Sequence, residues 1–64
     1  MSGSALAVER KRLNMNGDAF GAYLAELLGR ARPYNRHEVS AWETGLRPVP
    51  DRVERALLQA RLSE

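Results

Sequence analysis

Most of the side chains that could recognise another molecule lie between residues 30 and 47 of this sequence. Acidic and basic residues balance in residues 1–29 and again in residues 48–64, so the whole net charge of +2 lies in this segment. Guanidinium groups bind phosphate and carboxylate groups through paired hydrogen bonds, and a local basic patch on a nearly neutral chain favours an anionic partner. The alternative is that these arginines are only solvated. The charged and titratable residues of the segment are four arginines, two glutamates and the only histidine: Arg30, Arg32, Arg36, Arg47, Glu38, Glu43 and His37.

The residue types point to binding rather than catalysis. The chain has no cysteine and a single histidine, which leaves no disulfide framework and no set of ligands for zinc. No pair of carboxylates, nucleophile with a base, or glycine-rich phosphate loop is present. A chain of 64 residues also lacks the material for the walls of a substrate cleft. We therefore expect no enzyme, no metal, no cofactor and no small-molecule substrate.

The length and composition indicate one small folded domain, which we assign to residues 1–64. A hydrophobic share of 44% with 28% charged residues is ordinary for a globular protein. The uncharged run from Met1 to Val8 is too short for a signal peptide and lacks its basic region. No stretch is long and apolar enough to span a membrane. We therefore expect a cytoplasmic protein.

The clearest periodic pattern predicts a helix over residues 18–28. Five apolar residues fall at helical spacing and form one stripe. Asn16 can cap the start of this helix, and Asp18 suits the positive end of its dipole. Gly29 follows the last leucine, where a left-handed residue ends many helices, and Gly21 within the helix indicates close approach of a neighbouring helix. The stripe consists of Phe20, Tyr23, Leu24, Leu27 and Leu28.

Three further helices are predicted around this one. The first covers residues 4–13 with Ser4 as its cap, and the third covers residues 36–44, between the capping Asn35 and Gly45. The last runs to about residue 62 with Pro50 at its first position. Since no segment alternates like a strand, we expect an all-α fold, a compact bundle of four to five helices. Its expected core is Leu6, Leu13, Phe20, Leu24, Leu27, Leu28, Val39, Trp42, Val53 and Leu57.

Two short motifs resemble the helix-turn-helix of the phage-repressor family, also called Cro/repressor-like or XRE. They are Leu-Ala-Glu-Leu-Leu-Gly at 24–29 and Val-Ser-Ala-Trp-Glu-Thr-Gly at 39–45, followed by Pro48 and Pro50. The resemblance covers most of residues 16–58 and places the helix-turn-helix at about 18–44. It implies a sequence-specific, double-stranded DNA-binding regulator, a small repressor of bacterial or phage origin. One departure is a connection after Gly29 that is about four residues longer than the usual turn of three to four.

The resemblance also assigns roles to residues of the third helix. This helix enters the major groove, where its first residues contact base edges. Arg36 would fork onto guanine, His37 and Ser40 would hydrogen-bond to bases, and Ala41 would meet a thymine methyl group. Glu38 would either accept from cytosine or stay solvated. The residues expected to contact the DNA backbone are Arg30, Arg32, Tyr34, Asn35, Thr44, Arg47, Asn16 and Gly17.

Other residues of this region are expected to be structural. Val39 and Trp42 share the inward face of the third helix. The resemblance pairs Glu43 with an arginine of the first helix, for which Arg10 and Arg12 are both candidates. Tyr34 has two possible roles: a phosphate contact, or a plug of the loop over the core.

The same resemblance implies a homodimer on DNA, since operators of this class are read by two-fold dimers. A chain this short has no separate dimerisation domain, so the contact would fall on the last helix at Leu58 and Leu62. The alternative function is a helical protein-interaction module or antitoxin-like adaptor that reads little DNA. Glu38, Glu43 and the small net charge favour that alternative.

Overall fold

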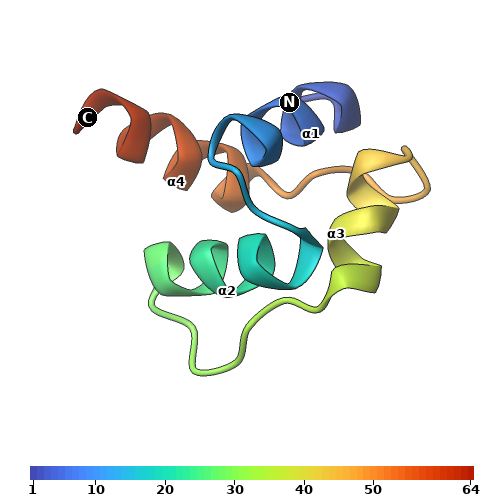
Figure 1. Ribbon diagram of the computed structural model, residues 1–64, viewed down its shortest axis with the longest axis horizontal. Helices are drawn as coiled ribbons and strands as arrows, with labels where there is room; N and C mark the ends of the chain where they lie inside the picture. The colour runs from blue at the N-terminus through green and yellow to red at the C-terminus, as the bar shows by residue number, and fades with distance from the viewer.

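The computed structural model describes residues 1–64 and contains four α-helices and no strand. They are α1 (Gly3–Arg12), α2 (Gly17–Leu28), α3 (Arg36–Glu43) and α4 (Asp51–Leu62). Helix α2 packs against both α3 and α4, and α1 packs against α3 (Figure 1). The predicted all-α fold is confirmed, with four helices and no fifth. None of these helices has the length and apolar character that crossing a membrane requires.

The ends of α2 and α3 follow the capping residues that the sequence offers. The Asn16 side chain accepts a hydrogen bond from the Ala19 amide at 2.8 Å, and Gly29 closes α2 in the left-handed conformation at φ 68°. Asn35 and Glu38 form a reciprocal capping box at the start of α3. These local bonds satisfy amide groups that the helices themselves leave free, so both helices begin where predicted, to within one residue.

Two predicted helix starts need correction. Helix α1 is capped by Ser2, whose hydroxyl accepts from the Ala5 amide at 3.1 Å, and not by Ser4. Pro50 is the residue before α4, in an extended conformation, and is not the first helical residue. Each helix start moves by one residue from its predicted position.

Nine buried side chains, drawn from all four helices and the connection before α3, form a single hydrophobic cluster. Leu27 is 38% exposed, so its prediction as a core residue was wrong. Leu13 and Leu28 are partly buried against the cluster, so their predictions were only partly right. The buried face of α2 is turned toward Gly21 and Ala25, because the 29–35 connection packs there. The cluster consists of Leu6, Phe20, Leu24, Ala25, Tyr34, Val39, Trp42, Val53 and Leu57.

The connection 29–35 runs back along α2 from its C-terminal end to its N-terminal end (Figure 1). The Tyr34 amide donates to the carbonyl of Gly21 at 3.3 Å, and a Cβ on Gly21 would lie 1.9 Å from the Tyr34 carbonyl oxygen. Gly21 therefore does permit a close approach, but the approaching backbone belongs to this connection and not to a helix. The Tyr34 ring then meets the Trp42 ring edge-on, with centroids 4.9 Å apart.

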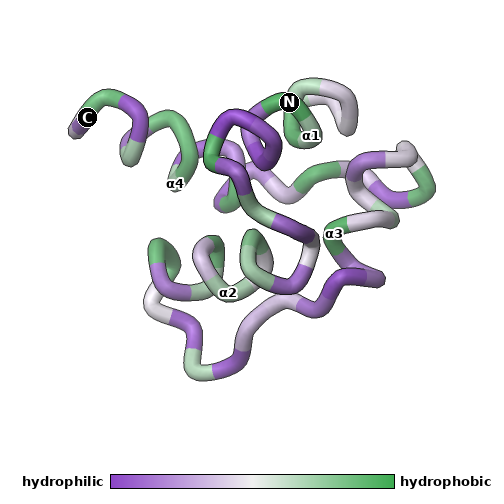
Figure 2. The backbone as a smooth tube through the Cα atoms, viewed as in Figure 1, coloured by the Kyte–Doolittle hydropathy of each residue, from purple (hydrophilic) through white to green (hydrophobic).

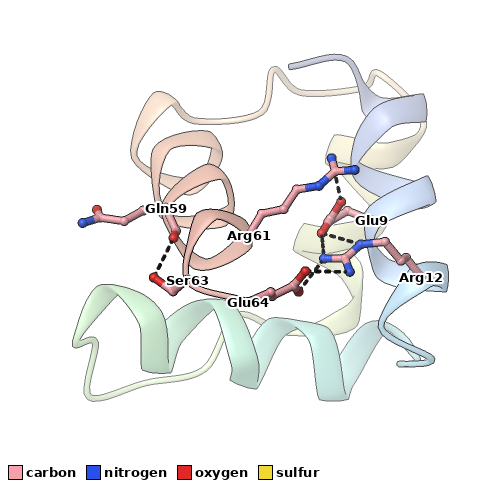
Figure 3. A network of polar contacts seen from close by, with 6 residues as sticks. All are labelled: Glu9, Arg12, Gln59, Arg61, Ser63 and Glu64. Atoms are coloured by element: carbon pink, nitrogen blue, oxygen red, sulfur yellow. Dashed lines mark hydrogen bonds and ion pairs between the residues drawn. The ribbon is translucent and has the colours of Figure 1, made fainter.

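A polar network joins α1 to the end of α4 (Figure 3). Arg12 binds Glu9 and also Glu64, the latter at 2.9 Å, and Arg61 lies 3.8 Å from Glu9. Glu9 is only 7% exposed, so these arginines offset the cost of burying its charge. The hydrogen bond from Arg12 holds the pKa of Glu64 below its usual value. The two termini of the chain lie on the side of the molecule away from the 29–35 connection (Figure 1).

Candidate nucleic-acid interface

Helix α3 presents a short polar strip to solvent. Val39 and Trp42 are 1% and 6% exposed, which turns the opposite side of the helix outward, as the spacing predicted. Arg36, His37 and Ser40 are exposed on that side, and the start of this helix is coloured as hydrophilic (Figure 2). The three side chains that can offer hydrogen bonds to a partner therefore lie together.

Ala41 and Glu38 flank this strip and are half-buried. The Glu38 carboxylate accepts from the Asn35 amide at 3.4 Å, while the Asn35 side-chain oxygen accepts from the Glu38 amide at 2.9 Å. The carboxylate expected at a cytosine and the Asn35 oxygen thus both have a structural partner. These two residues serve first to start α3.

The N-terminal end of α2 borders the strip on one side. Arg36 lies against Gly17, where a Cβ would be 3.1 Å from the Arg36 Cβ, and a shallow depression is lined by Asn16, Gly17, Arg36 and Ser40. The Asp18 carboxylate accepts from the Arg36 amide at 3.2 Å. One carboxylate thereby ties the starts of α2 and α3 together, so the free amides of α2 and the side chains of α3 face the same region.

The far end of α3 is held by an ion pair with α1. Arg10 donates through Nε and Nη2 to both carboxylate oxygens of Glu43, at 2.7 and 3.2 Å, and through Nη1 to the Met15 carbonyl at 3.1 Å. The hydrogen bond to Glu43 raises the pKa of Arg10 despite its partial burial. The predicted pairing of Glu43 with helix α1 is confirmed, and its partner is Arg10 and not Arg12. The orientation of α3 is therefore fixed at both ends.

Tyr34 is a core residue. The predicted contact of this side chain with a DNA phosphate was therefore wrong. The residue is 2% exposed, so its alternative role as a plug over the core is the one that the structure shows. The Arg30 guanidinium lies 4.0 Å from the ring centroid, and Arg52 Nε donates to the hydroxyl at 3.4 Å. Burial acts to raise the pKa of Tyr34, but the two guanidinium groups outweigh it and lower that pKa.

A pocket of about 510 Å³ lies on the side of α3 away from the start of α2, between the 29–35 connection, the 45–50 linker and α4. Arg30, Arg47 and Arg52 line it together with His37 and Ala41 of α3. Arg52 was not predicted as a site residue, because no spacing in the sequence relates α4 to α3.

The arginines of the 30–47 segment carry charge that no carboxylate neutralises within ion-pair distance. Among the basic side chains, those paired with carboxylates are Arg10, Arg12 and Arg61, all outside the segment. Arg32 and Thr44 are exposed, and the Thr44 hydroxyl donates to the Ser40 carbonyl at 2.9 Å. The positive segment predicted from the sequence therefore carries unpaired guanidinium groups on α3, at Arg36, and in the pocket beside it, at Arg30 and Arg47.

The remaining predicted residues lie apart from this surface. Leu58 and Leu62 are 50% and 87% exposed on α4, outside the core. No group of three histidine, cysteine or carboxylate residues could hold a metal ion.

Comparison of the chain with models of protein families, with curated proteins and with solved structures gave no match.

Proposed function

We propose that this chain is a sequence-specific double-stranded DNA-binding regulator, in which α2 and α3 act as a helix-turn-helix. The observation that carries the proposal is the arrangement around α3: an exposed strip of Arg36, His37 and Ser40, with the start of α2 on one side and three arginines on the other. Helix-start amides and guanidinium groups can both bind phosphate. The three arginines are Arg30, Arg47 and Arg52. The major groove admits one α-helix, with a phosphate strand along each of its edges. A single helix flanked on both sides by such groups suits this geometry. As a regulator of bacterial or phage DNA, the protein would act in the cytoplasm.

Each residue then has a defined role in the complex. Arg36 forks onto a guanine, and His37 and Ser40 bind neighbouring bases, with Ala41 against a thymine methyl group. The free amides near Asn16 and Gly17 receive one phosphate strand, helped by the dipole of α2 and opposed by the Asp18 carboxylate at the same helix start. Backbone contacts on the other strand come from Thr44, Arg47 and Arg30, with Arg32 on the connection before α3.

The long connection is compatible with this proposal. A helix-turn-helix usually has three or four residues in its turn, and this chain has seven between Leu28 and Arg36. Because the connection returns along α2, it brings the start of α3 back to the start of α2, where Asp18 binds the Arg36 amide. Both helix starts can therefore approach one duplex.

The decisive experiment is selection of bound sequences from a randomised duplex pool, followed by anisotropy titrations at two salt concentrations. We expect an enriched sequence, bound more weakly at high salt because counterions compete for the phosphates. Arg36→Ala should lose roughly 1–3 kcal/mol of binding free energy on that sequence, about 5- to 150-fold in affinity. Arg55→Ala, an exposed arginine on α4 away from α3, is the matched control and should bind as the parent does.

A pool that yields no enriched sequence at low salt contradicts the proposal. That outcome would favour the protein-interaction module, for which α3 and its flanks would be a contact surface for a helical partner. If Arg36→Ala binds the enriched sequence as well as the parent does, the protein binds DNA but α3 is not the helix that contacts the bases.

Dimerisation through α4 is a separate prediction. Leu58 and Leu62 are apolar, exposed and one turn apart, so they would cover one another across a two-fold axis. Substituting both by aspartate should halve the mass of the dimer in light scattering, because like charges would meet at the contact. Leu46→Asp, at an exposed leucine outside α4, is the control. An unchanged mass in the double variant would place the contact elsewhere.

A further inference from the structure

We propose that the pocket beside α3 is a phosphate-binding site in which Tyr34 orients two arginines, Arg30 and Arg52. This inference deepens the proposed function, and rests on it to the extent that the phosphate belongs to a DNA strand. The same guanidinium groups would accept a free phosphate ion, so the shared chemistry is a tetrahedral oxyanion. Arg47 lines the same pocket and is the third cation available to it.

The Tyr34 side chain fixes both guanidinium groups from inside the core. Its ring is 2% exposed and packs edge-on against Trp42, so its position is set by the fold. Arg30 lies over the face of the ring at 4.0 Å, and Arg52 Nε donates to the hydroxyl at 3.4 Å. Two flexible side chains, from the connection and from α4, are thereby held at one phenol, which lowers the entropy lost when they bind an anion.

The charge at this place is not compensated within the protein. None of these arginines has a carboxylate within ion-pair distance, although other arginines of the chain are paired. Glu38 also lines the pocket, and its carboxylate accepts a hydrogen bond from the Asn35 amide. Like charges that share one phenol repel each other, and an oxyanion would relieve that repulsion. The planar guanidinium fork matches the oxygen geometry of phosphate.

The location favours a DNA phosphate as the natural source. His37 and Ala41 line the pocket and also belong to the side of α3 that faces a groove, so the pocket continues that surface. It lies on the side of α3 opposite the start of α2, where the second phosphate strand would pass. Two of the residues that build it, Arg30 and Tyr34, belong to the long connection, which gives this departure from the usual turn a binding role.

The test compares Arg52→Ala, Tyr34→Phe and the control Arg55→Ala. We expect Arg52→Ala to weaken binding to every duplex alike, by about tenfold. The slope of log affinity against log salt should fall by the contribution of about one phosphate contact. Tyr34→Phe keeps the ring and removes the hydroxyl, so thermal unfolding should be unchanged while DNA binding weakens by a smaller factor. Tyr34 thus acts as a positioning residue, not as a ligand.

An NMR titration with inorganic phosphate provides a second readout on the parent chain. The Nε–Hε signals of Arg30 and Arg52 should shift with phosphate and not with chloride at the same ionic strength, and Arg55 should not respond. Phosphate binding without any duplex binding would support this site and contradict the proposed function. Duplex binding by the parent with Arg52→Ala and Tyr34→Phe both equal to Arg55→Ala would overturn this inference and leave the proposed function intact. Unshifted arginine signals in phosphate, with no change in salt slope, would also overturn it.

Discussion

Replacing Gly21 by alanine is expected to lower the free energy of unfolding by about 3 kcal/mol, at the upper end of what overpacking costs. The new Cβ would lie 1.9 Å from the Tyr34 carbonyl oxygen and 2.8 Å from its carbonyl carbon. Both are backbone atoms, so the connection itself must move away from α2. Tyr34 would then lose the hydrogen bond from its amide to the Gly21 carbonyl, and its ring would lose its edge-on contact with Trp42. Total stabilities of roughly 3–10 kcal/mol are expected for a chain this short, so the substitution would remove between about a third and all of the stability of the fold.

Urea and thermal denaturation followed by circular dichroism measure this effect. Gly17→Ala is the matched control, because it also adds one methyl group to a glycine of α2. There the nearest atom is the Arg36 Cβ at 3.1 Å, a side-chain atom that can shift. The gain in helix propensity from glycine to alanine, up to about 1 kcal/mol, should offset that contact. A Gly21→Ala chain as stable as Gly17→Ala would show that the connection does not pack on α2.

Removing the Glu43 carboxylate is the second substitution with a large expected effect on stability. Glu43→Ala leaves the Arg10 guanidinium without its paired acceptor while the side chain is only 22% exposed. Hydrogen bonds to charged groups contribute about 1.5–3 kcal/mol each, and partial exposure lets water recover part of that loss. We therefore expect a decrease of about 2 kcal/mol in the free energy of unfolding.

A double-mutant cycle with Arg10→Met isolates this pair. The double variant has no unpaired charge, so it should be more stable than the sum of the two single losses predicts, by at least about 1 kcal/mol. Arg12→Met, which removes the arginine that binds both Glu9 and Glu64, should show no coupling to Glu43→Ala. Additive losses for Arg10→Met and Glu43→Ala would mean that the pair does not hold α3 against α1.

The elements of this fold could be predicted because their signals are local. Asn16, Asn35 and Gly29 act on amides and carbonyls within four residues, and the spacing of Phe20 and Leu24 marks one face of one helix. The inward direction of Val39 and Trp42, and hence the exposed strip on α3, follows from the same period. Even the position of the excess charge could be found by counting residues along the chain.

Contacts between distant segments decided which side chains are buried and which side chains pair with one another. The burial of Tyr34 and the exposure of Leu27 both depend on the path of the 29–35 connection along α2, which no local pattern specifies. The family resemblance narrowed the partner of Glu43 to two arginines, and only the packing of α1 against α3 selected Arg10, 33 residues away in the sequence. Arg52 reaches Tyr34 across 18 residues for the same reason. Short-range hydrogen bonding and periodicity set what each segment becomes, whereas side-chain partners depend on packing that exists only once the whole chain has folded.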